Sequence, residues 1–363
     1  MVGGLQLGCL KPKHNPNLKH YEKEIHFTPI KTFFENPILL AMIALAVCAS
    51  PGIGDDGFDC PDKHSTSWTY SGTGDWFTSS HWSNGVPVCN EIISYYAGID
   101  NGYEAQISSG SASACEVVLG NTVTDSGNLI VDGSGSSLTT CRGIYVGNYG
   151  KGKLSITNGA TVTTNGVGNI AWGTSTTKSI GTATVDGTSS TWTVAYEFDI
   201  GGTTNASGGI GLLTLSNGGT VTAPQAHVYG SGTLAGKGTF TMTSGGTTLE
   251  GTLAPSGGTL TIGGDLTFSV TPGNTPTLEC NVTPASADNV SISGSANLAG
   301  KISVTMTGST FTAGSTYILL SASGGLLGTT FGTVSIKGGS GDCFTPTITY
   351  VGNDVKLYLE PCN

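Results

Sequence analysis

The middle of the chain repeats a short apolar pattern, and this repeat limits the possible folds more than any other feature. Each unit begins with a five-residue run in which the first and third residues are apolar, the fourth is polar and the fifth is Gly or Asn. These runs start at Leu129, Leu154, Ala183 and Leu213, about 25 to 30 residues apart. A second apolar position follows at Leu138, Val162, Trp192 and Val221. We expect a third run at the end of each unit, an apolar pair before Gly: Tyr145-Val146-Gly147, Ala171-Trp172-Gly173, Asp199-Ile200-Gly201 and Val228-Tyr229-Gly230.

Each unit therefore holds three short runs separated by turn residues. Alternation of apolar and polar residues is typical of strands with one buried face, and no helical period lies between them, which argues against alternating strands and helices. The pattern predicts an all-β fold, a right-handed parallel β-helix (a three-sided solenoid) with one unit per coil. Two unit types alternate, one with Asp132 or Asp186 after the first run and one with Asn158 or Asn217, and Asn suits corners with positive φ.

The segments flanking the repeat carry further motifs. Before it stand Gly74-Asp75-Trp76 and a run from His81 to Pro87, and after it come Gly251 to Pro255, Gly258 to Leu266, Ala287 to Val290 and Phe311 to Tyr317. With these flanks the chain resembles the passenger domains of bacterial autotransporters, of the strand-loop-strand type also found in PEP-CTERM-associated surface proteins, over roughly residues 66–360. The resemblance implies a solenoid followed by a distinct C-terminal β-module. The strands of the outer-membrane barrel that follows such passengers are not recognisable in this sequence.

Four regions follow from these patterns. We expect a signal peptide with an extended positively charged start at 1–49, a Trp-containing N-cap segment at 50–114, parallel β-helix repeats at 115–270, and a passenger-like, sandwich-like capping module at 271–363 that ends in a hairpin. The signal peptide rests on the apolar run 38–48, which is too short for a membrane span. Residues 45–48 loosely match a lipidation motif, and a buried core segment is the other alternative.

Charge narrows the choice of partners. The formal net charge is −10 and the only arginine is Arg142, whereas nucleic-acid binding needs a basic footprint. We therefore expect no nucleic acid and no membrane span in the mature chain, and a secreted or cell-surface location. The 57 glycines and the 10% of charged residues are unlike the composition of an ordinary enzyme domain.

Export would favour disulfides among the nine cysteines. Segments 344–350 and 354–359 are expected to form a hairpin around Gly352-Asn353, which would place Cys343 opposite Cys362 and allow a disulfide. Two weaker predicted pairs are Cys60 with Cys89 and Cys115 with Cys141, and Cys280 is left over.

No catalytic constellation, metal site or cofactor is predicted. Glu197 and Asp199 lie two residues apart and could share one face, but only one unit carries them, so a solvated edge is the favoured interpretation. Trp76 and Trp82 could bind sugars, although closing the open end of the solenoid is the preferred role. The predicted function is a non-enzymatic, structural or adhesin-like surface protein whose partners are glycans, matrix or further copies of the chain. The alternative is a β-helix protein that binds or degrades polysaccharide.

Overall fold

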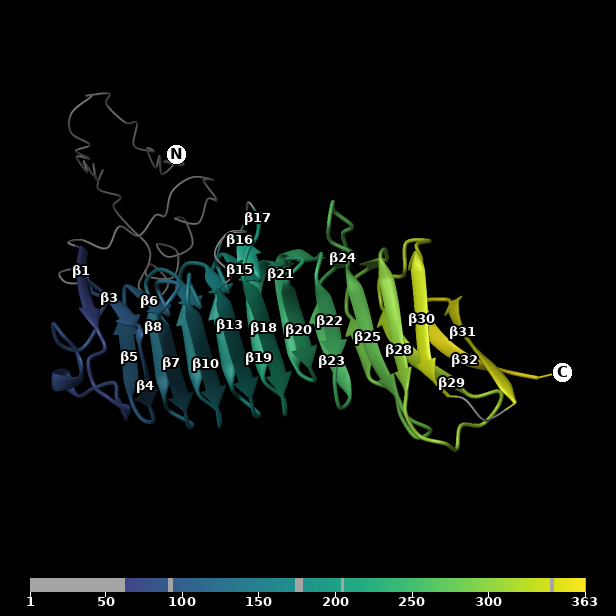
Figure 1. Ribbon diagram of the computed structural model, residues 1–363, viewed down its shortest axis with the longest axis horizontal. Helices are drawn as coiled ribbons and strands as arrows, with labels where there is room; N and C mark the ends of the chain where they lie inside the picture. The colour runs from purple at the N-terminus through teal and green to yellow at the C-terminus, as the bar shows by residue number, and fades with distance from the viewer. Residues whose placement is uncertain (1–62, 91–93, 174–178, 204–205, 340–342, 363) are drawn as a thin grey trace, which may run out of the picture. The chain divides into compact units, whose positions relative to one another are not determined.

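Residues 63–90, 94–173, 179–203, 206–339 and 343–362 are described by the computed structural model (Figure 1). The predicted signal peptide at 1–49 and Cys60 lie outside these ranges. Two long sheets contain almost all the strands, so the predicted all-β class with stacked parallel strands is confirmed. Among the described residues the one helical element is the short 3-10 helix η1 (Ser79–His81).

The strands of the two large sheets alternate along the chain, so each coil of the stack contributes to both. The 11-stranded sheet contains β2 (Thr73–Asp75), β4 (Asn101–Ile107), β7 (Ser126–Asp132), β10 (Lys151–Thr157), β13 (Ile180–Asp186), β18 (Ile210–Ser216), β20 (Gly232–Gly236), β22 (Thr252–Pro255), β25 (Thr277–Val282), β28 (Lys301–Met306) and β30 (Thr333–Gly338). The 19-stranded sheet contains β1 (Lys63–Ser67), β3 (Ser94–Ile99), β5 (Ser111–Ala114), β6 (Glu116–Leu119), β8 (Ser137–Thr140), β9 (Ile144–Val146), β11 (Thr161–Thr164), β12 (Gly168–Ile170), β14 (Thr191–Val194), β15 (Glu197–Ile200), β19 (Thr220–Val228), β21 (Thr239–Leu249), β23 (Thr259–Gly263), β24 (Leu266–Phe268), β26 (Asn289–Ile292), β27 (Ala296–Asn297), β29 (Thr316–Ala322), β31 (Phe344–Val351) and β32 (Asp354–Pro361). A two-stranded sheet is formed by β16 (Gly202–Thr203) and β17 (Ala206–Ser207).

Equivalent residues of successive repeats lie side by side, as the sequence predicts. Leu129 pairs with Leu154, which pairs with Ala183, and Ala183 pairs with Leu213. The second run is aligned in the same way, from Leu138 through Val162 and Trp192 to Val221. These side chains are buried, so each row is a column of the apolar interior.

The third run departs from the prediction. Val146 pairs with Ile170, not with Trp172, and Ile200 pairs with Val228, not with Tyr229. The prediction used glycine to mark the end of the run, but the left-handed position of Gly147 (φ 74°) and Gly201 (φ 80°) is occupied in the coil between them by Ala171 (φ 65°). In the coil of β12 the register error follows from this substitution, because alanine rarely adopts positive φ.

The alternation of two unit types has a physical explanation at one corner of the stack. Asp132 Oδ1 accepts hydrogen bonds from Thr157 Oγ1 (2.6 Å) and Asn158 Nδ2 (2.7 Å) of the next coil. Asp186 Oδ1 is bonded in the same way by the Ser216 hydroxyl and Asn217 Nδ2. Both asparagines have positive φ, as predicted. Each carboxylate-bearing unit is thus matched by an Asn-bearing unit stacked on it.

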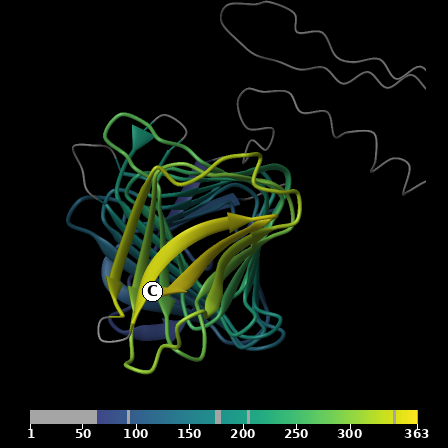
Figure 2. The same ribbon diagram turned by 90° about the vertical axis from the view of Figure 1, so that its right-hand side faces the viewer.

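The C-terminal end of the stack is covered by antiparallel strands. The hairpin of β31 and β32 turns at Gly352-Asn353, as predicted, and β32 pairs antiparallel with β29. Figure 2 shows these strands, in yellow, lying across that end. Val355, Leu357 and Leu359 of β32 are buried, so the hairpin covers the last part of the apolar interior. Parallel pairing itself reaches from β1 to β30, beyond the predicted repeat boundaries of 115–270 on both sides.

Candidate functional site

One face of the 19-stranded sheet presents two rows of hydroxyl groups, which we call the hydroxyl face. Its residues alternate with the buried column of Leu138, Val162 and Trp192, so their side chains point outward. The first row is Ser111, Ser137, Thr161, Thr191, Thr220, Thr239, Thr261, Ser291 and Ser321. The second row is Ser113, Thr139, Thr163, Thr193, Thr222 and Thr241.

The two rows are regular in both directions. Hydroxyls repeat about 4.8 Å apart along the stack and roughly 6.6 Å apart along each strand, the spacings of neighbouring strands and of alternate residues. Thr163, Thr193 and Thr222 are at least partly exposed, and within the described part of the chain their hydroxyls make no hydrogen bond. These groups can therefore bond to a ligand or to water. No charged residue belongs to either row.

A second candidate is a polar cluster on the neighbouring run of the same sheet, around Asp199. Glu197 and Asp199 are both on β15 and alternate with buried Phe198 and Ile200, so they share a face, as the sequence suggested. The stacking places Asp199 between Asn169 of β12 and His227 of β19. The sequence prediction missed Asn169, because the register of the third run was wrong in that coil.

The cluster is mostly buried and only partly satisfied. Asp199 is 2% exposed, Asn169 is fully buried and Tyr229 is 4% exposed. The Asn169 Nδ2 group donates to the carbonyl oxygen of Gly202 at 2.7 Å. No hydrogen bond reaches Asp199 Oδ1, Asn169 Oδ1 or the Tyr229 hydroxyl. Such buried, unpaired polar atoms are rare and call for an explanation.

Burial dominates the electrostatics of this cluster. Burial is the largest cause and the charge of Glu197 the second, and they raise the pKa of Asp199 to about 8 although a hydrogen bond with the Asn169 side chain lowers it. Burial also raises the pKa of Tyr229, together with the charges of Asp199, Glu197 and Glu250. A carboxyl group with this pKa is mostly protonated at pH 7.

The rim of the cluster is tied together by side chains from three coils. His227 stacks on Tyr229 with ring centroids 3.8 Å apart, and His227 Nε2 lies 3.2 Å from Glu250 Oε1, without the alignment of a hydrogen bond. Gln225 Nε2 donates to Glu197 Oε1 at 3.3 Å. His227 and Tyr229, in the coil of β19, and Glu250, in the next coil, were not selected from the sequence, because only stacking brings them beside Asp199.

Within the described ranges no group of three or more His, Cys, Asp and Glu side chains could hold a metal ion. The chemistry available at Asp199 is proton binding by a carboxyl group, beside the carboxylate of Glu197. Both residues could act together only on a ligand that reaches this largely closed position.

The tryptophans of the N-cap segment are packed inside it. Trp76 is fully buried and Trp82 is 4% exposed, with ring centroids 4.8 Å apart, and Trp82 Nε1 donates to the Trp76 carbonyl oxygen at 2.8 Å. Trp68 is packed edge-on against Trp82. Trp76 and Trp82 present no exposed ring to a sugar, because both lie in the apolar core.

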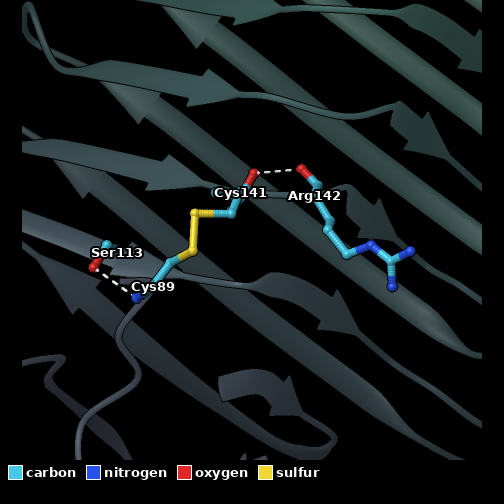
Figure 3. The surroundings of a disulfide bond; sticks show 5 residues. Cys89, Ser113, Cys141 and Arg142 are labelled. Atoms are coloured by element: carbon cyan, nitrogen blue, oxygen red, sulfur yellow. Dashed lines mark hydrogen bonds between the residues drawn. A yellow bond between two sulfur atoms is a disulfide. The ribbon is translucent and has the colours of Figure 1, made fainter. Parts of the chain in front are cut away.

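The cysteine pairs differ from the predicted ones. Cys89 is bonded to Cys141, so the pairs Cys60–Cys89 and Cys115–Cys141 are wrong (Figure 3). Cys115 is also disulfide-bonded. The Cys89 N–H group donates to Ser113 Oγ at 3.2 Å, which holds Cys89 beside the coil corner where Cys141 lies. Sequence spacing could not indicate this, because the N-cap segment folds back along the stack.

The predicted Cys343–Cys362 bond is not formed in the structure either. The hairpin does place the two residues opposite each other, with the Cys362 N–H group 3.1 Å from the Cys343 carbonyl oxygen. Both thiols are exposed and free, and a hydrogen bond to the Cys343 side chain raises the pKa of Cys362. The two thiols lie close enough to share this hydrogen bond, but no covalent bond joins them. Cys280, left over in the prediction, is a free buried thiol.

Comparison with protein-family models, with curated proteins and with solved structures gave no significant match. None of the helical residues in the described ranges forms a helix long and apolar enough to span a membrane.

Proposed function

We propose that this protein is a non-enzymatic, structural or adhesin-like component of the cell surface or extracellular matrix. In this proposal the stacked strands form a right-handed, three-sided parallel β-helix that is exported and carries a C-terminal cap, as in the autotransporter passengers that the sequence resembles. The observation that carries the proposal is the hydroxyl face, with its nine successive outward Ser and Thr residues in one row.

The chemistry of this face suits a neutral, hydroxyl-rich partner. Each hydroxyl can donate and accept a hydrogen bond, and one bond contributes only about 1 kcal/mol net. Many such contacts repeated at a fixed interval add up for a polymer that has a repeat of its own. A neutral polysaccharide of the surface or matrix has that chemistry, whereas a nucleic acid would need cations that the face lacks.

The test is binding of the purified protein to insoluble neutral polysaccharides and to a glycan array. The variant carries Thr163→Val, Thr193→Val and Thr222→Val, which remove adjacent hydroxyls of one row but keep the β-branched shape. We expect affinity to fall roughly tenfold to hundredfold, since about three hydrogen bonds are lost.

The matched control carries Thr182→Val, Thr184→Val and Thr214→Val, on outward positions of β13 and β18 in the 11-stranded sheet. It should bind like the unchanged protein. Equal losses in both variants, or undiminished binding by the first, would show that the hydroxyl face is not the recognition surface.

The second candidate function is polysaccharide degradation at Asp199. It is favoured by one observation, a buried carboxyl group that lies two residues from a second one, and this burial raises the pKa of Asp199 to about 8. Its test is glycan turnover that disappears in both Glu197→Gln and Asp199→Asn variants. Turnover that survives both changes removes this candidate.

A further inference from the structure

The unpaired oxygen atoms around Asp199 belong to residues of stacked coils. Asn169 and Asp199 are register partners on β12 and β15, and Tyr229 follows β19 directly. Each of these atoms is buried, and a side-chain amide or carboxylate oxygen can only accept a hydrogen bond. Asp199 Oδ1 and Asn169 Oδ1 therefore cannot pair with each other unless a proton is added between them.

Among the described groups stacked around Asp199 there is no Lys or Arg side chain. Glu197 is on the same strand, His227 and Tyr229 come from the coil on one side, and Glu250 follows β21 in the coil beyond. Asn169, from the coil on the other side, is neutral. His227 is itself close to Glu250, with 3.2 Å between Nε2 and Oε1. An ionised Asp199 would be a buried charge among carboxylates, which is costly.

We propose that Asp199 is a proton-binding site that holds neighbouring coils together at neutral pH and releases them at alkaline pH. The proton comes from solvent and converts Asp199 from an acceptor into an O–H donor. That donor can pair with the amide oxygen of Asn169 or with the Tyr229 hydroxyl. Loss of the proton removes the donor and leaves a buried carboxylate, so β12, β15 and β19 must open to water around it.

The direction of the pH effect follows from the shift. The pKa of Asp199 is raised from 3.8 to about 8 on folding, so between these values the folded protein binds a proton that the unfolded chain has released. Stability falls as pH rises through this window and becomes constant above about pH 8. Asp199→Asn cannot titrate. Relative to the unchanged protein, the variant should gain stability steadily from pH 5 to 8.

The first experiment measures the midpoint of thermal unfolding from pH 5 to 9.5 for the full chain and for Asp199→Asn. The difference in midpoint should grow with pH and level off above about pH 8. Asp265→Asn is the control, because hydrogen bonds from Ser295 lower the pKa of this exposed carboxyl group. Its difference should not vary over the same range. A constant difference for Asp199→Asn would overturn the proposal.

The second experiment locates the opening by hydrogen exchange, corrected for the intrinsic effect of pH on exchange. Above pH 8, amides of β12, β15 and β19 should exchange faster in the unchanged protein but not in Asp199→Asn, with β25 and β28 as internal reference strands. Glu197→Gln removes a neighbouring charge and should move the onset to lower pH. Exchange that rises uniformly along the stack, or an onset unmoved by Glu197→Gln, would contradict a proton site at Asp199.

Discussion

Removal of the Cys89–Cys141 disulfide should destabilise the N-terminal coils far more than the rest of the stack. The bond closes a loop with a sequence separation of 52 residues. The chain-entropy model gives a loop of this length about 4 kcal/mol of stabilisation. The bond joins the N-cap segment to the corner after β8. Without it, the segment that forms β3 to β8 gains conformational freedom in the unfolded state.

The change is the double substitution Cys89→Ser and Cys141→Ser, which leaves no odd thiol from this pair. In a stack of repeats each coil contacts mainly its neighbours, so the loss is local rather than shared by the whole chain. Hydrogen exchange at increasing denaturant reports this directly, because it gives an opening free energy for each strand. We expect the value to fall by about 4 kcal/mol in β3 to β8 and to change little in β25 and β28.

Cys343→Ser with Cys362→Ser is the matched control, because both thiols are exposed and free. Surface changes of this kind usually stay within about 0.5 kcal/mol. A loss below about 1 kcal/mol in the first variant would refute the loop-entropy reasoning. A loss of equal size in every coil would refute the local coupling.

Two further changes test the interior and the corners. Trp192→Ala should lower the free energy of unfolding by about 3 to 5 kcal/mol, because Trp192 is fully buried, packs on Phe198 and donates its indole N–H to Thr164 Oγ1 at 3.0 Å. Chemical denaturation measures this loss. A loss under about 1 kcal/mol would mean that the coil collapses around the cavity. Asp186→Ala removes the acceptor of two side-chain hydrogen bonds and should cost about 1 to 3 kcal/mol, measured in the same way against Glu279→Ala at an exposed position of β25. No loss would show that these corner bonds merely replace bonds to water.

The columns of the interior could be predicted from the sequence because the first and second runs have a strict period of two. Leu129, Leu154, Ala183 and Leu213 align in the structure as their spacing indicated. A slip of one residue would turn every buried side chain of a strand outward, so the apolar pattern allows one register only. The hairpin at Gly352-Asn353 was predictable for a similar reason, since its turn residues separate two alternating runs.

The hydroxyl face also lies in the sequence, as outward Ser and Thr residues on either side of each buried position in the second run. The length of the two rows cannot be predicted from the sequence, because the stacking of the strands decides which residues are neighbours in a row. Thr239 and Thr261 are neighbours in the row, yet their local sequences share little beyond a Thr on either side of Phe240 and Leu260. The structure is needed to show that the first row continues into β26 and β29.

Asp199 could be selected from the sequence, but the reason for its importance could not. Its burial comes from the stacked coils, which place Asn169, three strands earlier in the chain, on one side of it and His227 on the other, and this burial is the main cause of its raised pKa. Recognising Asn169 as its neighbour requires the register of β12, and that register is hidden where Ala171 takes the left-handed position that glycine holds in adjacent coils. Because a single alanine has positive φ, the sequence predicted a solvated edge where the structure has a buried carboxyl group. In a stacked fold, a residue's environment is set mainly by residues one coil away. An error in the register of one strand therefore conceals a site even when residues of that site have been selected from the sequence.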